Sequence, residues 1–227
     1  MFSKRVLKAA TVLVGFSLTV AWGDLTWDHS GSGTFGGDGD WNNTGTNTVW
    51  WDGSSNVAWT ADEVAVFSST GGGQTVSVTE TVSVDDVIYS GPATTLLQGG
   101  GAITTATNDD LLFNYVTADR SDRTLTIDTQ LTGTGTTTFS GTNTDTNRGG
   151  NLTYDLNNAA NDRAGDMYVY GVNGANGGGY SVNLVYSDDG QLGDSGNTVV
   201  LGGGNRPGSL SADADLTLAR TVEFKSN

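Results

Sequence analysis

The stretch from Trp50 to Phe67, WWDGSSNVAWTADEVAVF, decides the fold class, because it sets three tryptophans among turn-forming residues directly before a strand-like run. Tryptophans in such a Gly-, Ser- and Asp-rich setting cannot form the apolar stripe of a regular amphipathic helix. We expect Trp51 and Trp59 to lie over the first turn of a repetitive β-structure, near Val66, and to cap its open core. All five tryptophans beyond residue 23 lie in this N-terminal part: Trp27, Trp41, Trp50, Trp51 and Trp59.

The composition outside this segment predicts strands and turns. The chain has 34 glycines but only 2 prolines among its 227 residues. Thr and Val dominate between the glycines, and these residues favour strands, whereas Gly and Asp favour turns. No window shows apolar residues at sustained helical spacing. The sequence therefore predicts an all-β fold without helices.

Short alternating runs recur along the chain with turns between them. The stretch Gln74–Gly91, QTVSVTETVSVDDVIYSG, alternates apolar and polar residues, as half-buried strands do. Both the strands of an antiparallel β-sandwich and the coils of a parallel β-solenoid alternate in this way, so both architectures stay open at this point. In either case the predicted inward residues are Val76, Val78, Val82, Val84, Val87 and Tyr89.

Residues 1–23 are typical of a secretory signal peptide. Three basic residues precede an apolar run from Ala9 to Trp22, and Ala21 and Gly23 put small residues at the −3 and −1 positions. A membrane anchor is the alternative, but this run is shorter than the roughly 20 residues that span a bilayer. We expect cleavage after Gly23 and an exported mature chain.

The charge of the mature chain excludes whole classes of partner. Removal of residues 1–23 leaves seven basic against 25 acidic residues, a formal net charge of −18. Such a surface repels nucleic acids and anionic lipids, so we expect neither a nucleic-acid partner nor membrane insertion. The chain has no cysteine, so burial and β-ladders must hold the exported domain together without disulfides.

Several motifs resemble a known family. Gly37–Asn43 (GDGDWNN) and Trp50–Phe67, followed by QTVSV, look like the N-terminus of bacterial autotransporter-associated β-strand repeat proteins. Gln130–Thr144, Asp189–Gly204 and Ser211–Phe224 are similar to the repeat units of that family. The resemblance implies a right-handed parallel β-helix passenger, displayed on or released from a bacterial surface. It divides the chain into a Trp-rich cap at 24–70 and repeats at 71–227, with the C-terminal end cut short.

Two candidate binding sites stand out. Trp41 and Trp51 could stack on sugar rings and make the capping region a carbohydrate-binding module. Carboxylates clustered at turns could bind calcium, because calcium prefers oxygen ligands. The candidates for calcium are Asp38, Asp40, Asp85 and Asp86.

We expect a structural or adhesive module of a bacterial cell surface, without catalytic residues or an obligate cofactor. An extracellular glycan or matrix surface is the expected partner. The first alternative is the carbohydrate-binding module, and the second is a calcium-dependent polysaccharide lyase that would use Arg120 or Arg123 beside the acidic pairs. The single histidine, His29, lies within a few residues of the predicted mature N-terminus. As a general base it would need an orienting acid and a nucleophile in a formed cleft, so it is interpreted as a solvated loop residue.

Overall fold

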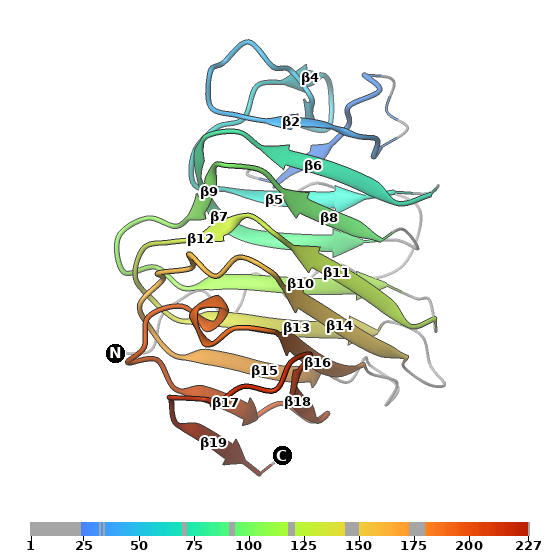
Figure 1. Cartoon of the computed structure of the whole chain (residues 1–227). Coiled ribbons are helices and arrows are strands. Elements are labelled where there is room, and N and C mark those ends of the chain that lie inside the picture. Colours follow the sequence, from blue (N-terminus) through green and yellow to red (C-terminus); the bar gives the residue numbers. More distant parts are fainter. Residues whose placement is uncertain are drawn as a thin grey trace.

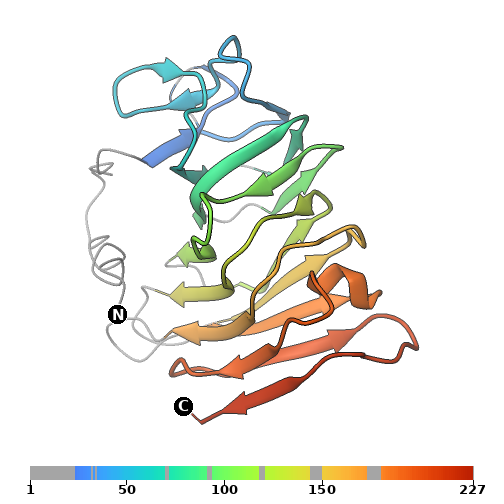
Figure 2. The same ribbon diagram turned by 90° about the vertical axis from the view of Figure 1, so that its left-hand side faces the viewer.

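The alternating runs form strands that coil around a common axis in a parallel β-solenoid (Figure 1). The computed structural model describes residues 24–31, 33, 35–69, 72–90, 94–117, 121–143, 150–172 and 180–226. The predicted signal peptide therefore lies outside the described residues, as does Arg120. Figure 2 shows the coils stacked from the N-terminal part at one end to the C-terminal part at the other.

Each coil contributes one strand to each of two long sheets. In the first sheet the order is β4 (Asn56–Val57), β3 (Trp50–Trp51), β1 (Asp24–Trp27), β5 (Glu63–Ser68), β7 (Thr81–Ser90), β10 (Leu111–Thr117), β13 (Thr137–Asn143), β15 (Met167–Val172), β17 (Val199–Gly202) and β19 (Val222–Lys225). In the second sheet the order is β2 (Gly39–Trp41), β6 (Gln74–Val78), β8 (Thr95–Gln98), β11 (Arg123–Ile127), β14 (Asn151–Leu156), β16 (Ser181–Tyr186) and β18 (Gly208–Ala212).

A short third ladder joins the start of β7 to β9 (Ala102–Thr104) and β12 (Gln130–Leu131). One 3₁₀ turn, η2 (Asp189–Leu192), follows β16 and is capped by the Asp188 side chain. Among the described residues, no helix is long and apolar enough to cross a bilayer.

The strand pairing decides between the two architectures that the sequence leaves open. Within the two long sheets, neighbouring strands run parallel except where β3 pairs with β1 and with β4. Parallel neighbours require a crossover between them, which the next coil of the solenoid supplies. The antiparallel β-sandwich is therefore wrong as an alternative, and the parallel β-solenoid is confirmed.

The inward residues stack in columns along the solenoid axis. All six inward residues predicted between Gln74 and Gly91 are at most 1% exposed, which confirms the alternation. The column that we call the central column runs through Leu25, Ala65, Val87, Phe113, Phe139, Val169, Leu201 and Phe224. Its first seven members are at most 7% exposed.

Two glycines explain how the coils stack closely at one corner. Gly135 and Gly165 both have a positive φ, at 112° and 138°. A Cβ atom on Gly135 would collide with the carbonyl of Asp109 in the coil before, and a Cβ on Gly165 would collide with the carbonyl of Gly135. Glycine therefore permits both the conformation and the contact between backbones.

Asparagine side chains hold the coils together inside the corners. Asn161 accepts a hydrogen bond from the backbone N–H of Leu131 at 2.7 Å and donates to the carbonyl of Gln191 at 2.8 Å. Asn197 donates to the carbonyl of Arg163 at 2.9 Å. Each amide therefore helps to satisfy buried backbone groups of an adjacent coil.

Candidate functional site

The N-terminal end of the core is closed by a group of rings that we call the aromatic cap. Its members are Trp27, Trp41, Trp50, Trp59 and Phe67, all at most 6% exposed. The Trp50 and Trp59 ring centroids are 4.7 Å apart, and those of Trp41 and Trp59 are 4.9 Å apart. Most of the contacts are edge-to-face or tilted, the arrangement that aromatic quadrupoles favour. The Trp-rich segment is thus a buried cap.

The indole N–H groups of the aromatic cap differ in their hydrogen bonding. Trp27 donates to the carbonyl of Gly37 at 2.9 Å, and Trp59 donates to the carbonyl of Ser83 at 3.2 Å. Among the described residues, the buried Trp41 and Trp50 indoles have no oxygen or nitrogen partner. Trp41 and Trp50 pack edge to face against each other with 5.0 Å between their ring centroids, and an aromatic face accepts N–H groups weakly.

The structure separates the two tryptophans proposed for sugar stacking. Trp41 is fully buried in the aromatic cap, so no ring face is open to a sugar while the cap is closed. Trp51 is half-buried on β3, beside the buried Trp50. The expectation that Trp51 covers the first turn needs correction, because Trp50 takes that position and Trp51 remains accessible. The stacking hypothesis stays a prediction and rests on Trp51.

The four aspartates proposed for calcium belong to different sheets. Asp38 and Asp40 lie at β2, whereas Asp85 and Asp86 lie in β7. An Asp38 carboxylate oxygen accepts from the N–H of Thr75 at 2.7 Å, and one of Asp86 accepts from the N–H of Leu112 at 3.2 Å. Within the described ranges, no three His, Cys, Asp or Glu side chains are close enough to hold a metal ion. Two of these carboxylates thus tie neighbouring strands together.

The cationic and histidine candidates also have local partners. Arg123 donates to the Tyr115 hydroxyl at 3.3 Å and to the carbonyl of Asp122 at 3.3 Å. The His29 ring stacks on Trp27 with a centroid separation of 6.1 Å. The His29 ring also packs over Gly39, between Asp38 and Asp40 in the sequence, and leaves no room there for a Cβ atom.

A buried arginine that the sequence did not single out links three successive coils. Arg163 is 1% exposed and donates to the Thr137 hydroxyl at 3.0 Å and to the Thr105 hydroxyl at 3.1 Å. It also donates to the carbonyls of Thr132 at 3.1 Å and Asp109 at 2.6 Å. Burial lowers the pKa of its guanidinium to about 10, so it stays charged at neutral pH. No local pattern marks this residue, because all four partners are distant in sequence.

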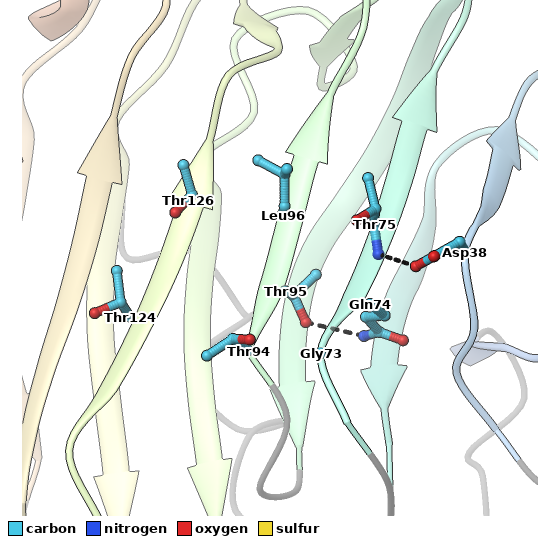
Figure 3. A pocket seen from close by; sticks show the side chains of 9 residues that line it. All are labelled: Asp38, Gly73, Gln74, Thr75, Thr94, Thr95, Leu96, Thr124 and Thr126. Atoms are coloured by element: carbon cyan, nitrogen blue, oxygen red, sulfur yellow. Dashed lines mark hydrogen bonds between the residues drawn. The ribbon is translucent and has the colours of Figure 1, made fainter.

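The outer face of the second sheet carries a shallow groove rich in hydroxyl groups. Its volume is about 510 Å³ (Figure 3). Thr75, Leu96 and Thr126 are registered neighbours on β6, β8 and β11, so they form a row across the groove. The other residues that line it are Asp38, Gly73, Gln74, Thr94, Thr95 and Thr124.

The polar rows continue beyond the groove toward the C-terminal end. The row through Thr124 passes to Thr153, Asn183 and Ser209 on the following strands. Asn183 accepts hydrogen bonds from Ser209 and Ser211, both at 2.9 Å. We call this surface, from β6 to β18, the outer hydroxyl face. Its polar groups repeat at the strand spacing of about 4.8 Å.

The geometry defines the class of this protein as a parallel β-solenoid with an aromatic cap at its N-terminal end. Comparisons with protein-family models, curated proteins and solved structures found no match.

Proposed function

We propose that the chain is an exported, non-enzymatic adhesive module of a bacterial cell surface. The outer hydroxyl face carries the proposal, because it presents rows of hydroxyl and amide groups on a rigid sheet. Such groups can hydrogen-bond to the hydroxyls of a polysaccharide laid across the strands, and a rigid surface loses little entropy on binding. The resemblance of the repeat motifs to autotransporter-associated passengers supports display at a surface.

The charge of the chain narrows the proposed ligand to a neutral glycan. With a formal net charge of −15 for the whole chain, it repels anionic polymers such as pectin and alginate. A neutral polysaccharide meets no such repulsion and offers donors and acceptors that match threonine hydroxyls.

Binding to insoluble neutral polysaccharides such as cellulose and chitin tests the proposal. The double variant Thr124→Val and Thr126→Val removes two hydroxyl groups from the groove and keeps the side-chain shape. We expect it to weaken binding by about fivefold or more, because each hydrogen bond contributes on the order of 1 kcal/mol. Depletion of the protein from solution by the polymer measures the affinity.

A matched control is Thr138→Val, which makes the same change on the outer face of the first sheet, at β13. Its binding should equal that of the wild type. Loss of binding only in Trp51→Ala would favour the carbohydrate-stacking alternative at the cap. If wild-type protein bound no neutral glycan and no matrix surface, the adhesive function would be refuted.

Export is proposed from the first 23 residues and is tested separately. N-terminal sequencing of protein recovered from the culture medium or the cell surface should begin at Asp24, the first residue of β1. Recovery of the uncleaved chain in a membrane fraction would instead show that the segment is an anchor.

A further inference from the structure

Phe224 is exposed although it occupies a core position of the solenoid. It is the last described member of the central column and pairs in register with the buried Leu201. Its side chain is 81% exposed, whereas the other large hydrophobic side chains among the described residues are buried or half-buried. The alternation that buries the earlier members points Phe224 to the same inner side of the sheet. Among the described residues, none covers this inward position.

The backbone of β19 also has a free edge. In the described part of the chain, β19 pairs with β17 alone, on one side. The N–H of Val199 donates to the carbonyl of Thr221 at 3.0 Å, so the peptide groups of Thr221 and, two residues on, Glu223 point toward β17. Because these groups alternate along a strand, those of Val222 and Phe224 point to the free edge. Such an edge is a template for another strand.

We propose that a second copy of this chain covers this end, with β19 of each copy paired antiparallel across a two-fold axis at Phe224. In that register the two Phe224 residues oppose each other and exchange both backbone hydrogen bonds, as a hydrogen-bonded antiparallel pair does. The two rings meet on the inner side. The contact would also cover the partly buried apolar residues of the last coil, Leu210, Leu216, Leu218 and Val222.

The charges beside Phe224 favour a second copy as the occupant. With Phe224 opposite itself, Glu223 of each copy opposes Lys225 of the other, so the dimer gains two pairs of opposite charge. Lys225 lies on the outer face, where its ammonium is 4.9 Å from the centroid of the Tyr168 ring. A strand that matches its own antiparallel copy in both apolar and charged positions is self-complementary, which a two-fold interface requires.

The opposite end of the solenoid does not offer the same edge. There the first sheet ends in the antiparallel strands β3 and β4, and the aromatic cap fills the core. Stacking of copies head to tail would bring the open end against a closed one. The proposed contact is therefore the closed, tail-to-tail dimer.

Charge reversal tests the register directly. The full chain, studied by sedimentation at about 0.15 M salt, should form a dimer, and F224D should be monomeric. Glu223→Lys and Lys225→Glu alone should each raise the dimer Kd by about tenfold or more, because each creates two like-charge pairs. An equimolar mixture of these two variants should recover the dimer, since the mixed dimer restores two pairs of opposite charge, one native and one with its signs exchanged.

The mixture also guards against misfolding, because a variant that fails to fold could not restore a partner. A monomeric wild type at all concentrations would overturn the proposal and leave this end to another occupant, such as a further coil of a longer polypeptide. A dimer unchanged by F224D and by both charge variants would place the contact elsewhere. Open-ended polymers would show head-to-tail stacking and would also overturn it.

Discussion

Replacement of Trp50 by alanine should lower the free energy of unfolding by roughly 3–5 kcal/mol. Trp50 is 1% exposed and lies within 5.6 Å, between ring centroids, of four other rings: Trp27, Trp41, Trp59 and Phe67. Its loss would leave a cavity in a region already built from rigid rings, which collapse poorly into the space. The expected loss is a large share of the typical margin of about 5–15 kcal/mol for a domain.

The neighbouring residue gives a matched control for this prediction. Trp51→Ala removes the same side chain one position further along β3, where it is only half-buried. Urea denaturation should place the midpoint of Trp50→Ala far below that of Trp51→Ala. Equal midpoints for the two variants would contradict the aromatic cap as a major source of stability.

The second large effect is expected at Arg163. Replacement by methionine keeps a long apolar stem but removes every donor. The Thr137 hydroxyl and the Thr132 carbonyl lose this partner, whereas the Thr105 hydroxyl and the Asp109 carbonyl keep the 2.9 Å hydrogen bond between them. Each buried acceptor left without a partner costs on the order of 1–3 kcal/mol. The variant no longer has to bury a charge, and this saving in desolvation free energy offsets part of the cost. We expect a net loss of about 2–4 kcal/mol in the free energy of unfolding.

Two further variants show whether the effect comes from the hydrogen bonds that link the coils. Arg163→Lys keeps the charge but cannot reproduce the planar set of donors, so it should also destabilise, by a smaller amount. Arg123→Met removes an arginine that is not fully buried and should change the midpoint little. If the denaturation midpoints of Arg163→Met and Arg123→Met agreed, the buried Arg163 would contribute no more to stability than the half-buried Arg123.

Some features could be read from the sequence because they depend on neighbours along the chain. Alternation within Gln74–Gly91 identified the six apolar inward residues, since successive side chains of a strand point to opposite faces. It did not identify Gln74, which is also buried at an inward position of β6. The cluster of tryptophans among turn residues also indicated a cap, because these residues lie close together along the chain. Four of the five rings are buried together, and the sequence did not show that Trp51 is the exception. The charge and the absence of cysteine are likewise properties of the composition alone.

Other features were decided only by the tertiary structure, because they depend on residues far apart in the sequence. Alternation is the same in parallel and antiparallel sheets, so only the strand pairing chose the solenoid. The register with β1 places Trp50 opposite Trp27 and Trp51 opposite Thr26, which decides which ring is buried. The role of Arg163 and the exposure of Phe224 arise from the stacking of coils, and no local pattern encodes which coil lies next to which.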